Sequence, residues 1–315
     1  MIALDTIRAA HDRIRPFIHH TPVLTCRTLD DRVGASLFFK CENFQKVGAF
    51  KARGGLNAVL QVAANQEGPA VATHSSGNHA QAVAFAARQV GLPAYIVMPR
   101  TAPQVKKDAV RGYGATVVEC EPNHAAREAG VRQVMAETGA VLVHPFDDDR
   151  VIAGQATTAV ELLADEGTAQ PFDRLLTPVG GGGLLSGVAL ATHYLSPTTQ
   201  VIGCEPDGAA DAVLSFRSGQ LETAPYIDTI ADGLTAPLSA RTLGIIRTHV
   251  GDILTVSDPE IMAAVRLIWE RMKIIVEPSC ALPLAVLIRY RDRFAGQKIG
   301  VVLTGGNVDL SRLPF

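Results

Sequence analysis

The feature that most constrains the fold is an alternation of two local patterns along the chain. Short apolar runs rich in β-branched residues recur, and Ala-rich segments with helical periodicity lie between most of them. In the segment NHAQAVAFAARQVG, for example, Ala82, Phe85 and Ala86 fall on one face. This alternation predicts an α/β fold with mostly parallel sheets covered by helices on both sides. The apolar runs are PAVATH (69–74), AYIVMP (94–99), TVVECE (116–121), AVLVHP (140–145), RLLTPVG (174–180), QVIGCEP (200–206) and KIGVVLTGG (298–306).

Length and charge narrow the class of protein. A chain of 315 residues can bury the cores of two subdomains. The net charge of −2 gives no reason to expect a nucleic acid or an anionic membrane as partner. The charge-free run at 175–192 contains four consecutive glycines and starts like a strand, so we do not read it as a membrane helix. Any anionic ligand must therefore be held by local features.

The five cysteines are scattered, odd in number and without a CxxC pair, which argues against a disulfide framework and a zinc knuckle. The first residues, MIALDTIRAAHDRIRPF, are charged throughout and lack the apolar segment of a signal peptide. We therefore expect a cytoplasmic protein.

Three loops at strand ends carry candidate site residues, where open α/β sheets bind ligands. In PVGGGGLLSG (178–187), consecutive glycines can turn backbone N–H groups toward a phosphate, and the helix that follows adds its positive end. In HSSGNH (74–79), a serine can cap the helix and an amide can reach a ligand. LTGGN (303–307) adds the hydroxyl of Thr304 in an apolar setting.

The glycine loop leaves alternatives open. It lacks the Gly-Lys-Ser/Thr of a P-loop, because Leu184 and Leu185 follow the glycines. A dinucleotide site is a weaker rival: Glu205 lies where a ribose-binding acid would, but no register of the glycines gives GxGxxG.

Lys51 lies between Phe50 and a helix start, in NFQKVGAFKARGG (43–55). An apolar pocket lowers the pKa of a lysine, and the neutral amine can form a Schiff base with an aldehyde. A phosphate cradle, a buried lysine, an amide and a hydroxyl together fit pyridoxal phosphate, about as well as they fit other phosphate ligands.

Five motifs, in order along the chain, resemble the serine racemase and serine/threonine dehydratase family of fold-type II pyridoxal-phosphate enzymes. The resemblance runs from HTPVLT (20–25) to GGNVDL (305–310), and its motifs are KCENFQKVGAFKARGGLNAV, THSSGNHAQAVAFAA, VIAGQATTAVELL, PVGGGGLLSG and LTGGNVDL. It implies two open, twisted, mostly parallel sheets with flanking helices, as in the tryptophan synthase β fold. We expect a large domain of 1–68 and 146–315 and a small domain of 69–145.

The resemblance also implies roles for individual residues. Lys51 would be the Schiff-base lysine, with Phe50 beside the cofactor ring, and Asn78 would bond the ring hydroxyl. Gly180, Gly181, Gly182 and Gly183 would hold the phosphate, and Thr304 would face the pyridine nitrogen. Ser76 matches the serine that acts on the substrate face opposite the lysine in racemases. Substrate binding would involve Ser75, Ser76, His79 and Arg127.

CEPDGAAD (204–211) matches the family's divalent-metal loop, with carboxylates from Glu205 and Asp211 and a backbone carbonyl from Ala209. Oxygen donors of this kind suit Mg²⁺, Mn²⁺ or Ca²⁺. This match also accounts for the acid that favoured a dinucleotide.

The expected reaction is dehydration of L-serine or L-threonine to a 2-oxo acid and ammonia, with serine racemisation as a second outcome. The alternative substrate is 3-hydroxyaspartate, and a more remote alternative is a non-catalytic phosphate- or metabolite-binding protein. The motif HPFDDDR (144–150) looks more like the dehydratases than the racemases. The family implies a homodimer. Where some relatives bind a nucleotide through serines, this chain has CRT (26–28), which makes a nucleotide effector doubtful although Lys46, Gln81 and Tyr113 remain.

Overall fold

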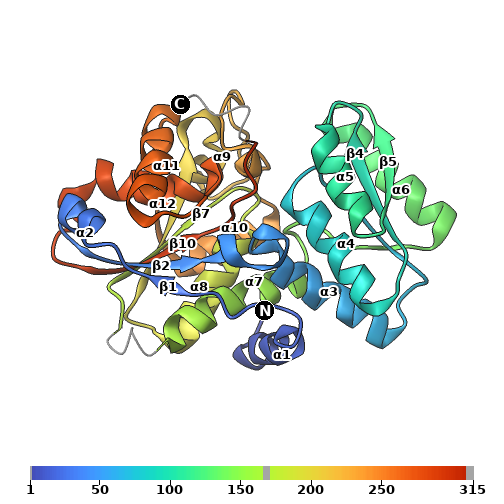
Figure 1. Ribbon diagram of the computed structural model, residues 1–315, viewed down its shortest axis with the longest axis horizontal. Coiled ribbons are helices and arrows are strands. Elements are labelled where there is room, and N and C mark those ends of the chain that lie inside the picture. The colour runs from blue at the N-terminus through green and yellow to red at the C-terminus, as the bar shows by residue number, and fades with distance from the viewer. Residues whose placement is uncertain (1, 166–170, 310–315) are drawn as a thin grey trace. The chain divides into compact units, whose positions relative to one another are not determined.

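The computed structural model describes residues 2–165 and 171–309, and their packing forms two units (Figure 1). The first unit holds the described residues up to Ile18 together with Lys51–Gln155. The second holds His19–Phe50 and the described residues from Ala156 onward. Each unit is built around its own mostly parallel sheet, as the alternating pattern predicts.

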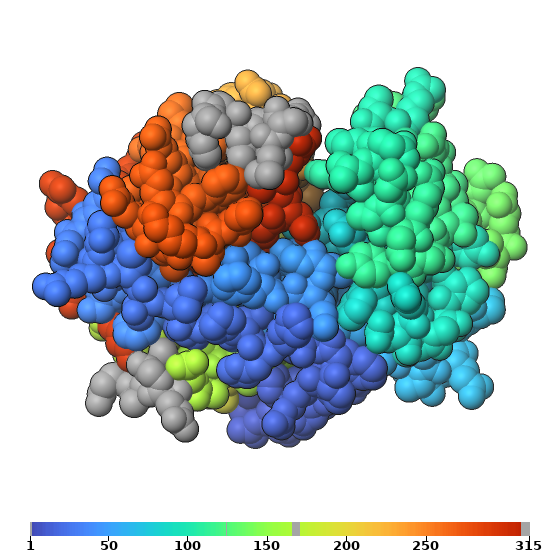
Figure 2. All heavy atoms as spheres, viewed as in Figure 1, coloured from blue at the N-terminus to red at the C-terminus, as the bar shows by residue number. Residues whose placement is uncertain are grey.

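The first unit contains a four-stranded, all-parallel sheet in the order β5-β4-β3-β6. Helices α4 and α5 lie on one face of the sheet and α6 on the other (Figure 1). In Figure 2, α4 and α5 appear next to each other on the visible surface of this unit. Its elements are α1 (Leu4–Ile14), α3 (Lys51–Asn65), β3 (Val71–His74), α4 (Asn78–Val90), β4 (Ala94–Pro99), α5 (Gln104–Gly112), β5 (Thr116–Cys120), α6 (His124–Thr138), β6 (Val141–Leu142) and the start of α7 (Asp149–Ala164).

The second unit contains a six-stranded sheet in the order β1-β2-β10-β7-β8-β9, parallel except for the β1–β2 pair. Helices α11 and α12 cover one face and α8 the other (Figure 1). Its helices and strands, besides the rest of α7, are β1 (Val23–Leu24), α2 (Arg27–Val33), β2 (Ser36–Cys41), β7 (Arg174–Pro178), α8 (Gly183–Leu195), β8 (Gln200–Pro206), α9 (Asp211–Ser218), α10 (Ala240–His249), β9 (Val250–Val256), α11 (Asp258–Met272), α12 (Pro278–Arg289) and β10 (Lys298–Leu303).

The α/β fold class is confirmed, and all seven predicted runs contain strands, although β6 is only two residues long. Strands β1, β2 and β9 were not among the predicted runs. Strand β9 begins VGDI, where a glycine and an aspartate interrupt the apolar run by which a buried strand is recognised.

The packing divides the chain differently from the predicted domains, which assigned α3 to the large domain. Helix α3 packs against α4 within the first unit: a Cβ on Gly55 would lie 3.1 Å from the Cβ of Ala82. This close approach needs the small residues of both helices. The predicted boundaries at 68/69 and 145/146 remain a proposal.

Candidate active site

The carboxyl edge of the four-stranded sheet gathers candidate residues of the first unit. Because the strands are parallel, the segments after β3, β5 and β6 all leave from the same edge. The segment after β3 carries Ser75, Ser76 and the start of α4, where Asn78 is the first residue. Arg127 lies in the first turns of α6, which follows β5.

Lys51 opens helix α3, and its amine reaches the turn that follows β6. The Nζ atom donates a hydrogen bond to the carbonyl oxygen of Pro145, at 2.9 Å. Burial lowers the pKa of Lys51 to about 8, although the residue as a whole keeps some exposed surface. About one tenth of the side chain is therefore an uncharged amine at pH 7, far more than for an ordinary lysine, and this form acts as a nucleophile or a base.

Two histidines, His79 from α4 and His144 from the turn after β6, interact electrostatically with this amine. His79 is buried, and its Nε2–H donates to the carbonyl oxygen of Val143, at 3.0 Å. Burial and the neighbouring Lys51 hold the pKa of His79 well below its usual range, and burial with the nearby His74 lowers the pKa of His144 to about 4. The His74 and His144 rings lie 5.5 Å apart, centre to centre. The site is thus lined with neutral imidazoles.

The two serines of HSSGNH do not cap the helix, contrary to the plain structural interpretation. Gly77 occupies the N-cap position of α4, and no side chain makes the capping bond. The Oγ of Ser75 instead accepts from the backbone N–H of Gly77, at 3.3 Å. Helix capping therefore does not explain why position 76 carries a serine.

Arg127 is more buried than a solvated helix residue would be. Its Nε is enclosed and has no hydrogen-bond partner among the described residues. The helix start itself is satisfied by Asn123, whose Oδ1 accepts from the N–H of Ala126, at 2.8 Å. A buried guanidinium donor without a partner favours a nearby anion.

In the second unit, the four glycines form the turn between β7 and α8. Gly182 has a φ of +86°, and a Cβ at this position would lie 2.7 Å from a methyl group of Leu238. A Cβ on Gly180 would lie 2.9 Å from the Cα of Leu234. These positions accept no larger residue, and the first amides of a helix lack intrahelical acceptors. The turn fits a phosphate at the α8 N-terminus.

Phe50 and Thr304 lie together at the end of β10. The N–H of Phe50 donates to the carbonyl oxygen of Thr304, at 3.0 Å, and Ala49 pairs with Gly305. Thr304 is buried. This pairing fixes the residue that immediately precedes Lys51 in the chain.

The proposed metal ligands Glu205, Ala209 and Asp211 lie in the second unit, between the end of β8 and the start of α9. All three residues are buried. The two carboxylate oxygens of Glu205 accept from the N–H groups of Ala212 and Val213, at 2.6 and 2.9 Å. Burial raises the pKa of Glu205 to about 8 and that of Asp211 to about 6, and one oxygen of Asp211 is buried without a hydrogen-bond partner among the described residues.

Within residues 2–165 and 171–309, no three His, Cys, Asp or Glu side chains are grouped closely enough to hold a metal. The loop instead offers the two carboxylates of Glu205 and Asp211 together with backbone oxygens. Oxygen donors of this kind fit a hard divalent cation.

Sequence reasoning missed Pro145, His74 and His144. The two histidines lie in the predicted runs 69–74 and 140–145, at the end where ligands bind, and that position was the available signal. The carbonyl of Pro145 has no sequence signal, because any residue supplies a carbonyl.

Among the described residues, no helix combines the length and the apolar character that crossing a membrane requires.

Comparison with known proteins identifies the family. The chain is 49% identical over 311 residues to a beta-hydroxyaspartate dehydratase of Paracoccus denitrificans, covering 99% of this chain and 98% of that protein. It is 47% identical over 313 residues to a serine racemase of Arabidopsis thaliana, covering 98% and 94%.

Among solved structures, the serine racemase of Dictyostelium discoideum superposes with a TM-score of 0.92 at 43% identity, covering 98% of this chain and 99% of that one. A threonine deaminase from T.th. gives a TM-score of 0.93 at 44% identity, with coverage of 98% and 99%. The family model described as "Pyridoxal-phosphate dependent enzyme" matches residues 14–305. The chain therefore belongs to the family of pyridoxal-phosphate dependent enzymes.

Proposed function

We propose that this protein is an ammonia-lyase that dehydrates a 3-hydroxy amino acid to a 2-oxo acid and ammonia. The observation that carries the proposal is the Lys51 amine, whose pKa burial lowers to about 8 and whose Nζ is held by a backbone carbonyl. General bases work best when their pKa lies near the working pH. A lysine left fully charged at pH 7 would serve neither as nucleophile nor as base.

The resemblance to the family suggests which residues would hold the cofactor. The amides of Gly180–Gly183 would bind the phosphate, and Asn78 would bond the ring hydroxyl. Phe50 would pack against the ring, and Thr304 would present an uncharged hydroxyl to the pyridine nitrogen. When bound, pyridoxal phosphate supplies an electron sink that makes the Cα proton of an amino acid removable.

Lys51 performs the proton transfer in this account. Its uncharged Nζ accepts the Cα proton, and the β-hydroxyl leaves with a proton as water. The remaining enamine takes up water and releases ammonia, which leaves the 2-oxo acid. His79 and His144 keep neutral side chains beside Nζ, so they compete little for the Cα proton.

Arg127 favours 3-hydroxyaspartate over L-serine and L-threonine as the substrate. Its buried Nε lacks a hydrogen-bond partner among the described residues, and a second substrate carboxylate would supply one. The relative from Paracoccus denitrificans bears the name of this reaction, which supports the same choice.

Ser76 supports racemisation as a second activity. Because its hydroxyl is not used as the cap of α4, it is available to return a proton to the face of Cα opposite Lys51. The same deprotonated substrate would then give either elimination or the other enantiomer.

Glu205, Asp211 and the carbonyl of Ala209 would hold Mg²⁺, or Mn²⁺ or Ca²⁺ in its place. The raised pKa values of both carboxyl groups mean that a cation would stabilise the loop by favouring their charged forms. The cation would therefore support the structure of this loop.

A cytoplasmic location and a homodimer complete the proposal. All five cysteines lie in the described part of the chain and are free thiols, which is typical of a reducing compartment. The homodimer rests on the resemblance to the family.

The test is release of 2-oxo acid from L-serine, D-serine, L-threonine and the isomers of 3-hydroxyaspartate, with and without Mg²⁺. The proposal predicts turnover of at least one of them, highest for a 3-hydroxyaspartate isomer. A protein that binds pyridoxal phosphate but releases no 2-oxo acid from any of them would contradict it.

A further inference from the structure

The turn between β6 and α7, residues 143–148, contacts the site at two points. The carbonyl of Val143 accepts from His79, at 3.0 Å, and that of Pro145 accepts from the Lys51 amine, at 2.9 Å. The turn is closed on itself, because Nδ1 of His144 accepts from the N–H of Asp147, at 2.9 Å. The position of this turn therefore decides where the lysine amine rests.

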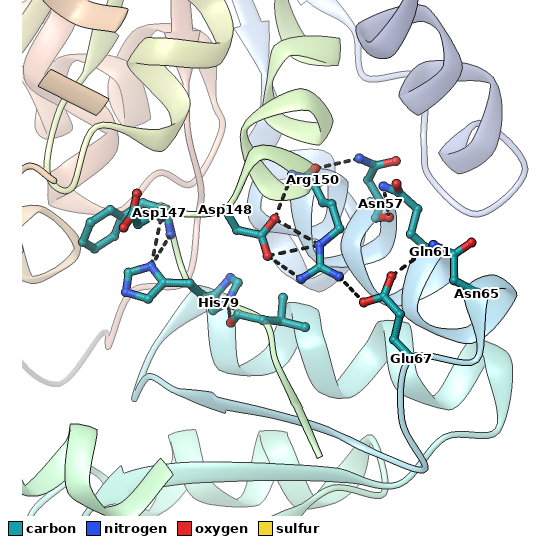
Figure 3. A network of polar contacts seen from close by, with 11 residues as sticks. Asn57, Gln61, Asn65, Glu67, His79, Asp147, Asp148 and Arg150 are labelled. Atoms are coloured by element: carbon teal, nitrogen blue, oxygen red, sulfur yellow. Dashed lines mark hydrogen bonds and ion pairs between the residues drawn. The ribbon is translucent and has the colours of Figure 1, made fainter. Parts of the chain in front are cut away.

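Arg150 holds this turn through Asp148. Its guanidinium donates to both oxygens of Asp148, with Nη2 at 2.7 Å from Oδ2 and Nε at 3.1 Å from Oδ1. Its Nη1 donates to Oε2 of Glu67, at 2.7 Å, beyond the end of α3 (Figure 3). The two acids compensate the charge of Arg150. All three side chains are partly buried, with exposed fractions of 25% for Arg150, 12% for Asp148 and 32% for Glu67. A bidentate fork of this kind fixes orientation as well as distance.

The backbone around Arg150 is also bound to helix α3. The amide of Asn57 donates to the carbonyl of Arg150, at 2.6 Å (Figure 3). The N–H of Gly54 donates to the side chain of Gln155, at 3.1 Å, and a Cβ on Gly154 would lie only 2.6 Å from the Cα of Gly54. Helices α3 and α7 thus meet backbone to backbone, one turn from Lys51.

We propose that Arg150 is a positioning residue, which fixes the 143–148 turn against helix α3 so that the carbonyl of Pro145 meets the Lys51 amine. The inference rests on the role proposed for Lys51. Arg150 does not touch the reacting atoms, and it acts through Asp148 and the turn. When the fork is lost, the turn loosens and water reaches Nζ, so the pKa of Lys51 rises from about 8 toward the ordinary lysine value.

The groups that face Lys51 are His79 from α4, His144 from the turn and, behind it, His74 from β3. Their pKa values keep His79 and His144 neutral above pH 6, so titration of Lys51 between pH 7 and 10 is read without charge changes at these two rings.

The test compares Arg150→Ala with Asp148→Asn, because the two changes alter charge in opposite directions. Both break the fork, so positioning predicts that both raise the pKa of Lys51. Loss of Arg150 removes a cation and loss of Asp148 an anion, so a purely electrostatic effect would shift the pKa in opposite directions. A rise of about one unit lowers the rate of labelling at pH 8 about fivefold, because the neutral fraction falls from about one half to about one tenth.

The measurement is the pH profile of Lys51 modification by a small amine-reactive ester, read by mass spectrometry of the full chain after removal of the cofactor. It requires no turnover, so it separates this inference from the proposed reaction. In the holoenzyme, kcat at pH 7 should fall in both variants, with KM changing less.

Arg150→Lys keeps the charge but loses the planar fork, so it should behave like Arg150→Ala. It also provides the milder variant if the alanine destabilises the chain. Arg266→Ala removes an exposed arginine paired with Glu270 at 2.7 Å, and it should leave the profile unchanged. Unchanged profiles in Arg150→Lys and Asp148→Asn, or opposite shifts in Arg150→Ala and Asp148→Asn, would overturn the proposal.

Discussion

Lys51 and Glu205 show the same physical effect with opposite consequences. Burial lowers the pKa of the lysine to about 8 and raises that of the glutamate to about 8, so each is driven toward its uncharged form. For Lys51 the uncharged form is the reactive one. For Glu205 it is the form that would not bind a metal, because a metal ligand must be ionised.

The neighbours of the two groups fit the different roles proposed for them, catalysis at Lys51 and support of structure at Glu205. The Nζ of Lys51 donates to a backbone carbonyl, and the nearby His79 and His144 are neutral. Both carboxylate oxygens of Glu205 accept hydrogen bonds, from the N–H groups of Ala212 and Val213 at the start of α9. The comparison predicts that variants at the first site change turnover, and that variants at the second change stability.

The largest effect is expected for Lys51→Ala. Loss of the base should lower kcat at least about 10³-fold, because no other amine lies in its place. Lys298→Ala is the matched control: the pKa of Lys298 is also lowered by burial, but its amine lies over the rings of Phe38 and Phe172. Similar losses of turnover in both variants would remove the distinction between the two sites.

Ser76→Ala should separate the two activities at the lysine site. Racemisation of L-serine should fall about 100-fold, because one of two proton-transfer groups is lost, while elimination changes less than about threefold. Chiral analysis of serine alongside 2-oxo acid release measures both rates in one sample. Racemisation that continues at the original rate would exclude Ser76 as its acid.

Arg127→Ala tests the substrate side of the same site. The value of kcat/KM for 3-hydroxyaspartate should fall about 30-fold, as expected for one charge-assisted hydrogen bond of about 2 kcal/mol, with little change for L-serine. Arg132→Ala, in the same helix and exposed beside Glu128, is the control and should have no effect. Equal losses of kcat/KM for the two substrates would show that Arg127 does not bind a second carboxylate.

The smallest effect on turnover belongs to the second site, where the expected change is a pH dependence of stability caused by Glu205. In the metal-free protein, its raised pKa contributes stability that is complete below about pH 4.5 and lost as the pH rises to about 8. The free energy of unfolding should therefore fall over this range, by up to about 5 kcal/mol.

Urea titrations at pH 5 and pH 8 measure this difference. Saturating Mg²⁺ should remove most of the fall by stabilising the carboxylates, and Glu205→Gln should leave only the smaller fall that the raised pKa of Asp211 causes. A fall that neither the cation nor the substitution changes would place its origin elsewhere.

Local signals in the sequence suggest the candidate site residues whose roles depend on short stretches of chain. Gly182 needs its residue type because of its φ and Gly180 because of a close approach, and Lys51 stands out beside Phe50. The fold class followed from the alternation of apolar runs and helical segments.

The rest depends on contacts between distant parts of the chain. In the sequence, Arg150 is one charged residue next to three aspartates, and nothing marks it as a positioning residue. Its ion pair with Glu67, 83 residues away in sequence, exists only in the folded chain. The carbonyl of Pro145 reaches Lys51 across 94 residues. Such pairings are set by the packing of α3, α7 and the β6–α7 turn, and no local pattern encodes them.

The most direct test of the account is borohydride reduction of the holoprotein, followed by mass spectrometry of its peptides. The account predicts one pyridoxyl phosphate adduct, on the Nζ of Lys51, and none on Lys298. An adduct on another side chain, or no adduct in protein supplied with the cofactor, would contradict it.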